Sequence, residues 1–403
     1  MLTAKRPAWL VYVAYNFMIY MTSASFWPFV GSYYTNVGIT RMQIGLIATF
    51  VTITSLIFQP LWAYVSDRLH NRRLVLLFLL GISAVAIFLY TIQPVFGVFA
   101  LAAITYYAFC SSIIPLGDAI ALNNLARMRV NFSYVRIGGT IGFAVCVFLL
   151  GRLYIGHLTW MFPATSILLV IAGIPVFFFP REKDGKEARA ASASIPEREA
   201  NSDPAKDVPP YRHFGIMLAL LMMFVAQIGL TYYSNFLSVY ATDLHYGSQT
   251  IGLLQVVSAM SEVPMLLFIS KLKVRFGTFR LLLFASFMIG VRLLLAGSTG
   301  TIAMVFVAQT TQSLSGILMY YCCITYISAN VSERHKSRGQ VLYTVLLGGV
   351  ASALGNLIGG ALSQAYGIRY GYIGMGAVVC TFTIAFAFVI WRLMKKGKIT
   401  AHE

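Results

Sequence analysis

The chain has 403 residues, of which 58% are apolar and only 11% are charged. Soluble domains carry about 25% charged residues, so this composition excludes an ordinary soluble enzyme, whose core could not cover such long apolar segments. The formal net charge of +17 would suggest a nucleic-acid partner in a soluble protein. Here the placement of the charges along the chain favours a membrane protein instead.

Twelve segments are long and apolar enough to cross a bilayer, for which about 20 residues suffice. The first of them is too long for a cleavable signal peptide, and no small-residue cleavage site follows it. We therefore predict an all-α membrane protein with twelve transmembrane helices. The expected spans are 9–35, 41–65, 74–93, 97–123, 135–155, 159–179, 213–241, 249–270, 280–298, 301–330, 341–364 and 369–392.

Basic residues are distributed unequally between the two sides of these spans. With the N-terminus inside, all but four of the 30 Lys and Arg lie on the cytoplasmic side. Arg41, Arg152 and Arg369 fall outside, and Arg292 lies in the middle of a span. This asymmetry predicts a multi-pass protein of the cell membrane with both termini cytoplasmic. The expected partners are the lipid bilayer and a small-molecule substrate, with no nucleic acid and a monomeric chain.

Residues 181–212 divide the chain into two parts. This segment holds seven of the thirteen acidic residues and almost no large apolar side chains, so it cannot bury enough surface to fold alone. We predict a flexible cytoplasmic linker here. It would separate an N-terminal six-helix bundle, 1–180, from a C-terminal one, 213–403.

An internal repeat supports this division. At an offset of 207 residues Ile44-Gly45-Leu46 matches Ile251-Gly252-Leu253, and Arg73-Leu74 matches Arg280-Leu281. Two halves repeated in parallel are typical of transporters that bind substrate between them. Glycines four apart, Gly138 with Gly142 and Gly355 with Gly359, indicate close helix contacts, although this spacing is common by chance.

Four charged residues remain inside the expected spans: Asp118, Arg136, Glu262 and Arg292. A charge at the bilayer centre costs about 3 kcal/mol on insertion scales, so such residues face the bundle interior and tend to pair. Glu262 and Arg292 lie on successive antiparallel spans at depths that differ by roughly 6 Å, within reach of long side chains. Asp118 and Arg136 can meet in the same way. The pairs could be static, but we favour substrate binding or proton exchange.

Other candidate residues are weaker. Asp67, followed by Arg68, Arg72 and Arg73, could close the inner face through ion pairs or form an ordinary solvated loop. Phe143, seven positions after Arg136, is expected at a binding cavity. The cysteines and histidines show no metal-ligand spacing, so no cofactor is expected. Most aromatic residues of the spans are predicted to face lipid or the interface, namely Trp27, Tyr33, Tyr34, Tyr106, Tyr107, Tyr232, Tyr233, Tyr320 and Tyr321.

Three stretches resemble one transporter family, the proton-coupled symporters of the major facilitator superfamily that include lactose, sucrose and phenylpropionate-type permeases. Phe58-Gln59-Pro60-Leu61 leading into Ser66-Asp67-Arg68-Leu69 is similar to the facilitator loop, with Ala63 and His70 in place of the usual glycines. The strongest match is Pro115-Leu116-Gly117-Asp118-Ala119 followed by Arg136-Ile137-Gly138-Gly139-Thr140-Ile141-Gly142-Phe143. Glu262 and Arg292 match the family's acid and Arg in spans 8 and 9.

The resemblance implies roles for these residues. Asp118 and Arg136 would contact substrate, Phe143 would stack on it, and Glu262 and Arg292 would take part in binding or coupling. One departure is that Gln312-Ser313-Leu314-Ser315 has no titratable group where lactose permease has a His and an acid. Gln312 would then bind substrate, and the proton would pass to Glu262 or Asp118.

The sequence thus predicts a secondary transporter, not an enzyme, that moves a small polar organic solute by alternating access. A sugar, a nucleoside or an aromatic acid would each suit the Asp and Arg residues. H⁺ symport is the favoured energetics. The alternatives are a proton-driven exporter of amphipathic compounds and an uncoupled facilitator.

Overall fold

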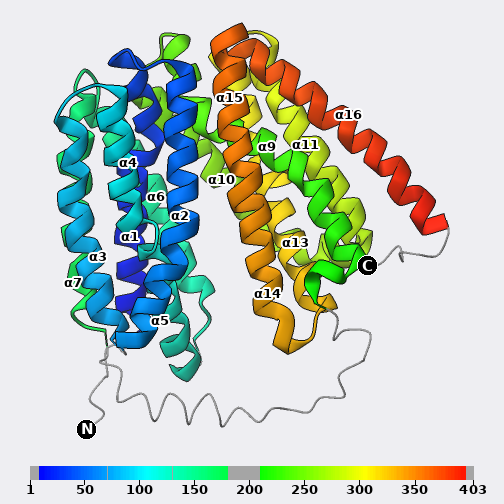
Figure 1. Ribbon diagram of the computed structural model, residues 1–403, viewed down its shortest axis with the longest axis horizontal. Coiled ribbons are helices and arrows are strands. Elements are labelled where there is room, and N and C mark those ends of the chain that lie inside the picture. Colours follow the sequence, from blue (N-terminus) through cyan, green and yellow to red (C-terminus); the bar gives the residue numbers. More distant parts are fainter. Residues whose placement is uncertain (1–8, 70, 129, 180–208, 396–403) are drawn as a thin grey trace. The chain divides into compact units, whose positions relative to one another are not determined.

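The computed structural model describes residues 9–69, 71–128, 130–179 and 209–395. All regular secondary structure in this part of the chain is helical (Figure 1). The expected linker lies outside the described residues except for its last positions, where Pro210–Arg212 form a short 3₁₀ turn, η4. The predicted linker and bundle boundaries therefore stay a prediction. His70 and His402 also lie outside the described residues.

The described helices group into twelve spans, several of them built from two or three consecutive segments. Those preceding the predicted linker are α1 (Leu10–Asn36), α2 (Arg41–Leu69), α3 (Arg72–Ala86) with η1 (Ile87–Thr91), α4 (Phe96–Cys110) with α5 (Ile113–Met128), α6 (Ser133–Leu153), and η2 (Leu158–Trp160) with α7 (Met161–Val176). Those following it are α9 (Phe214–Asp243), α10 (Ser248–Phe276), α11 (Thr278–Ser298), α12 (Ile302–Thr310) with η5 (Thr311–Leu314) and α13 (Gly316–Asn330), α14 (Glu333–Tyr343) with the π-helical η6 (Thr344–Ala351) and α15 (Ser352–Tyr366), and α16 (Ile368–Lys395).

The helices form two compact units. Of the described residues, those of unit 1 lie within 9–39, 53–179 and 247–253, and those of unit 2 lie within 40–52, 209–246 and 254–395. The first turns of α2 therefore pack with unit 2, and the first turns of α10 pack with unit 1. The two segments that change unit are those that carry the matching Ile-Gly-Leu triplets.

Length and hydropathy qualify most of these helices as membrane spans. Ten described helices pass this test, and α10 makes an eleventh if its two parts count as one span. α1 is the exception because it carries polar residues such as Asn16, which lower its hydropathy. More than half of its residues are buried inside unit 1. A helix enclosed by other helices does not need an apolar surface on every side. The twelve helices predicted from the sequence are confirmed.

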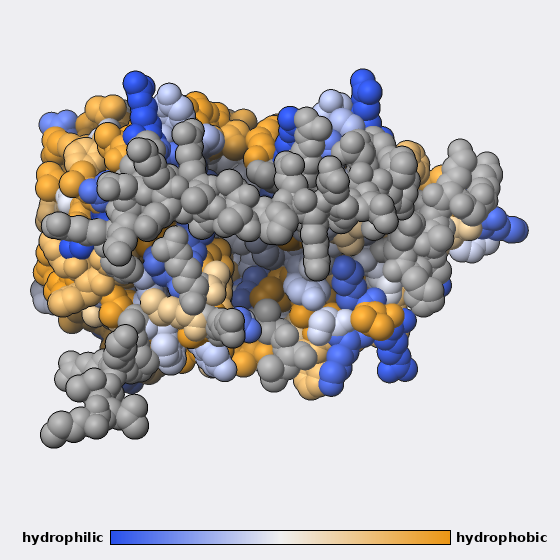
Figure 2. Space-filling model, turned by 90° about the horizontal axis from the view of Figure 1, so that it is seen from below, coloured by the Kyte–Doolittle hydropathy of each residue, from blue (hydrophilic) through white to orange (hydrophobic). Residues whose placement is uncertain are grey.

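The outward-facing side chains agree with a lipid environment. Large apolar residues are exposed along α3 and α7, and the left margin of the space-filling view, where these helices lie, is mostly orange (Figure 2). Examples are Val85 at 71% and Val170 at 60% exposed. Water-soluble proteins rarely expose continuous apolar surfaces of this kind, whereas lipid tails solvate them.

The predicted glycine contacts are confirmed inside each unit. In unit 1 a Cβ on Gly138 would lie 2.8 Å from Val13 Cγ1, and Gly142 packs on the backbone of Phe17. In unit 2 a Cβ on Gly355 would lie 2.6 Å from the carbonyl oxygen of Ile228. Backbone approach of this kind is what small residues permit in membrane helices. α1 thus crosses α6 closely, as α9 crosses α15.

The glycines of the repeat make equivalent contacts. A Cβ on Gly45 of α2 would lie 2.9 Å from Gly360 Cα of α15. A Cβ on Gly252 of α10 would lie 2.6 Å from the Val147 oxygen of α6. The repeat therefore marks two matched helix crossings, one in each unit.

Candidate functional site

The first candidate cluster lies in unit 1 around Asp118 of α5. Its Oδ2 is 3.7 Å from Nη1 of Arg136 on α6, and its Oδ1 accepts a hydrogen bond of 3.1 Å from Asn16 Nδ2 of α1. The Asp118 side chain is 20% exposed and that of Arg136 is 55% exposed. At 3.7 Å the ion pair is longer than a hydrogen bond. The structure therefore brings the predicted acid and base together while leaving the guanidinium accessible.

α1 supplies two partners of this cluster. Tyr20 accepts a hydrogen bond from Arg136 Nη1, and its ring centre lies 5.0 Å from the guanidinium carbon. Gly139 allows this approach, since a Cβ there would lie 2.7 Å from the Tyr20 ring and 3.1 Å from Asn16 Oδ1. The aromatic ring and the amide orient the charged pair. Both are neutral groups that can also bind hydroxyls.

The second cluster surrounds Arg292 of α11 in unit 2. Arg292 is 3% exposed, and its two terminal nitrogens donate to the side-chain oxygens of Gln309 and Gln312. The Tyr233 ring centre lies 4.2 Å from the guanidinium carbon, which is a cation–π contact. Arg292 Nε is buried without a hydrogen-bond partner among the described residues. The buried cation is thus held mainly by neutral oxygens and an aromatic face.

Gln312 connects this cation to Glu262 of α10. Gln312 accepts from Arg292 and donates through Nε2 to Glu262 Oε1 at 3.0 Å. An amide can do this because its oxygen accepts and its nitrogen donates. The predicted acid and base of spans 8 and 9 are therefore joined through the predicted binding residue Gln312. Glu262 itself is half-buried.

Gln309 completes the second cluster. Its oxygen also accepts from the Tyr233 hydroxyl at 3.2 Å, and its nitrogen donates to the Leu254 carbonyl at 3.0 Å. These bonds anchor the cluster to α9 and α10. Because every group around the cation is bonded to another, the site is preorganised.

The remaining predicted residues are not among the partners described for the two clusters. Phe143 is half-buried on α6, two turns after Arg136, and its place at a cavity stays a prediction. Asp67 forms an ion pair of 2.8 Å with Arg72, and Arg73 donates to the Phe179 carbonyl at 3.1 Å. Arg68 lies in the last turn of α2. The gating role of these four residues is likewise still a prediction.

Four partners in these clusters are not among the binding residues predicted from the sequence: Asn16, Tyr20, Tyr233 and Gln309. Asn16 and Tyr20 are one helical turn apart in α1, and two polar side chains on one face of a predicted span are a signal that could have identified them. Gln309 precedes Gln312 by three positions, which places both on one face of a helix. Tyr233 offered no signal, because it was assigned to the interfacial aromatic residues.

That aromatic assignment is wrong for most of the residues named. Five of the nine are buried, namely Tyr33, Tyr34, Tyr106, Tyr232 and Tyr233, whereas Trp27 and Tyr320 are 36% and 55% exposed. The buried rings pack against other rings between helices; Tyr33 and Phe162, for example, are 5.1 Å apart. Aromatic side chains bury large areas, and the sequence alone does not distinguish this from an interfacial position.

Comparison with known proteins gives consistent matches over nearly the whole chain. The model of the MFS_1 like family matches residues 9–373. The maltose permease of Geobacillus stearothermophilus is 25% identical over 398 residues, covering 98% of this chain and 96% of that protein. The putative nucleoside transporter YegT of Escherichia coli (strain K12) is 24% identical, covering 90% and 89%.

Solved structures show the same fold. A mutant of the nucleoside transporter NupG matches with a TM-score of 0.79 at 15% identity, covering 94% of this chain and 99% of that one. At this identity the match concerns the arrangement of the helices and not the substrate.

Proposed function

This chain belongs to the MFS_1 like family of major facilitator transporters, and on that premise we propose that it carries a neutral polar solute of the sugar or nucleoside class by alternating access, coupled to H⁺ symport. Membership of the family confirms the resemblance predicted from the sequence. The protein is a multi-pass membrane transporter and not an enzyme. The proposal includes cytoplasmic termini and a monomeric chain.

One observation carries the proposal: in each unit, neutral amide and tyrosine side chains contact an acid and an arginine. In unit 1 these are Asn16 and Tyr20, and in unit 2 they are Gln312, Gln309 and Tyr233. Amides and phenols both donate and accept hydrogen bonds, as solute hydroxyls do. The names of the curated relatives, a maltose permease and a putative nucleoside transporter, support this substrate class over an aromatic acid.

Glu262 is the proposed proton carrier. It is half-buried and bonded to Gln312, which in turn binds the buried cation Arg292. Protonation of Glu262 would remove the carboxylate charge at one end of this chain of bonds. The bond that Gln312 Nε2 donates to Glu262 would then weaken, because a neutral carboxyl is a poorer acceptor than a carboxylate. The Gln312 amide could then donate to a solute hydroxyl instead, which couples proton binding to solute binding.

Uptake into proteoliposomes tests the proposal, with maltose and uridine as probes and an imposed inward H⁺ gradient. We expect the native protein to accumulate one of them, and Glu262→Gln to equilibrate it without accumulation. The conservative Glu262→Asp variant should retain part of the coupling. If Glu262→Gln still accumulates solute against its gradient, Glu262 is not the coupling site. If the native protein itself only equilibrates solute, the protein is an uncoupled facilitator.

A further inference from the structure

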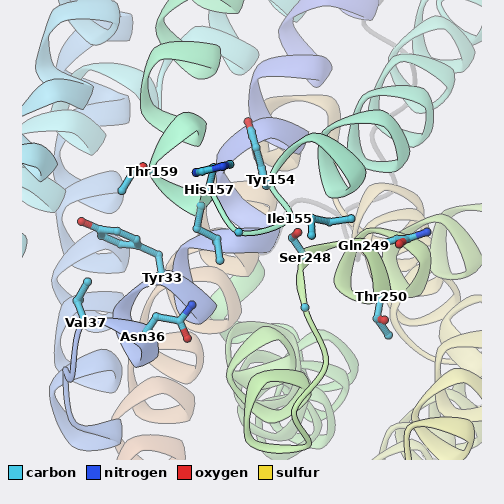
Figure 3. Close-up of a pocket in the computed structure, with 13 residues that line it drawn as sticks. Tyr33, Asn36, Val37, Tyr154, Ile155, His157, Thr159, Ser248, Gln249 and Thr250 are labelled. Atoms are coloured by element: carbon cyan, nitrogen blue, oxygen red, sulfur yellow. The ribbon is translucent and has the colours of Figure 1, made fainter.

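A polar cavity lies in unit 1, outside both charged clusters. It has a volume of about 560 Å³ and is lined by the end of α1, the connection between α6 and α7, and the start of α10. Figure 3 shows Tyr33, Asn36 and Val37 on one side and Ser248, Gln249 and Thr250 on the other, with Tyr154 and His157 between them. Small-molecule sites in proteins have volumes of about 300–1,000 Å³. The cavity is therefore large enough for an organic ligand.

The lining has the chemistry of a site for a neutral, hydroxyl-rich ligand. None of the described residues that line the cavity is an Asp, Glu, Lys or Arg. Among the described residues, the side chains of Asn36, Gln249 and Thr250 have no hydrogen-bond partner, so their donors and acceptors are available. Aromatic and aliphatic surface lies beside them, including Tyr33 and Val37. Amides bind hydroxyls in both directions, and apolar side chains cover the C–H faces of a sugar ring.

Hydrogen bonds and ring contacts hold the cavity walls in place. Tyr154 is fully buried, donates to the Ser25 carbonyl at 3.2 Å, and contacts the Phe29 ring edge-to-face at 5.1 Å. Ser248 donates to the Gly151 carbonyl at 2.8 Å, which fixes the start of α10 on α6. A site with rigid walls loses less conformational entropy when it binds a ligand.

We propose that this cavity is a second solute site, which binds a neutral polyhydroxylated molecule of the sugar type before or apart from the charged clusters. The choice of a sugar rests on the proposed function. The charge distribution of the sequence predicts that the cavity lies on the outer face of the membrane, where a solute arrives. The uncharged lining distinguishes the cavity from the clusters at Asp118 and Arg292. A ligand can bind in the cavity without separating an ion pair such as that of Asp118 and Arg136.

Protection of an introduced thiol tests the proposal in purified protein embedded in nanodiscs. Gln249→Cys is labelled with a hydrophilic maleimide in the presence of increasing maltose, after subtraction of labelling at the five native cysteines. We expect maltose to slow the labelling of Gln249→Cys. Thr299→Cys, in the exposed connection after α11 and outside the cavity, is the matched control and should be labelled at an unchanged rate. If Gln249→Cys does not fold, Ile155→Cys is labelled instead, because Ile155 is exposed and also lines the cavity.

Two further arms separate this site from the charged clusters. In an Asp118→Asn, Glu262→Gln background the protection should persist, because the cavity contains neither residue. Asn36→Leu removes two hydrogen-bonding groups, and we expect it to raise the maltose concentration for half-protection about tenfold, whereas Asn36→Gln should restore it. Absence of protection, its loss in the Asp118→Asn, Glu262→Gln background, or equal slowing at Thr299→Cys would overturn the proposal. These measurements report maltose binding and do not require transport. A protein that fails to transport solute can therefore still show or lack protection at the cavity.

Discussion

At the scale of single residues, the most constrained position is Arg292. A buried cation is tolerated only when oxygens or aromatic faces replace its hydration shell, and here Gln309, Gln312 and Tyr233 do so. The two glutamines bind separate nitrogens of the planar guanidinium. A lysine ammonium is a point charge and cannot reproduce that fork.

We therefore expect Arg292→Lys to lower kcat/KM for uptake at least about tenfold, which corresponds to 1.4 kcal/mol. Arg152→Lys is the matched control, because Arg152 is exposed at the end of α6 and its guanidinium carbon lies 5.5 Å from the Phe148 ring centre. Initial uptake rates in proteoliposomes measure both variants. Native-like rates for Arg292→Lys would show that the fork geometry is not needed.

At the scale of helices, the close crossing of α1 and α6 decides where the residues of the first cluster lie. Gly142 packs against the Phe17 backbone, and this contact sets the distance at which Asn16 reaches Asp118. Backbone cannot move aside as a flexible side chain can. A methyl group at Gly142 must therefore separate the two helices.

For this reason we expect Gly142→Ala to destabilise the protein by about 1–3 kcal/mol, as overpacked sites do. Gly81→Ala on α3 is the control: nothing lies within 4 Å of its added methyl group, and alanine favours helix by about 0.5–1 kcal/mol. Thermal unfolding in detergent compares the two variants. A Gly142→Ala protein as stable as Gly81→Ala would contradict the crossing described above.

The start of α2 and the end of α9 are also joined, by an ion pair of 2.8 Å between Arg41 and Asp243. Arg41 donates in addition to the Ser363 carbonyl at 3.1 Å. The side chains are 36% and 23% exposed, so water screens the pair, and we expect a coupling energy of about 0.2–1 kcal/mol.

A double-mutant cycle with Arg41→Gln and Asp243→Asn measures this coupling by thermal unfolding at low and high salt. The coupling should shrink as salt rises, because exposed charges are screened. A coupling that does not change with salt would mean that the two residues are linked through packing and not through charge.

At the scale of the whole molecule, the distribution of basic residues determines the expected orientation in the membrane. The basic residues predict an inner C-terminus and an outer connection between α6 and α7. A membrane-impermeant thiol reagent applied to intact cells should therefore label Ile155→Cys and leave Lys395→Cys unlabelled until the cells are opened. Both positions are exposed on the protein surface, so the reverse pattern would invert the topology.

The sequence by itself was sufficient for the twelve helices, for their repeat in two parts and for the four charges inside the spans. These properties are local: a span needs about 20 apolar residues in succession, and a charge within such a run is visible at once. Family membership followed from motifs that are equally local, such as Asp118 and Arg136 with the glycines after them.

Only the tertiary structure decided which groups surround those charges. Asn16 is 102 positions from Asp118, and Tyr233 is 59 positions from Arg292, so neither contact has a signature in the local sequence. The same holds for the uncharged cavity, whose walls come from α1, α10 and the connection between α6 and α7. Hydrophobicity places a helix in the membrane, but the packing of side chains between helices determines which faces meet, and that depends on residues far apart in the chain.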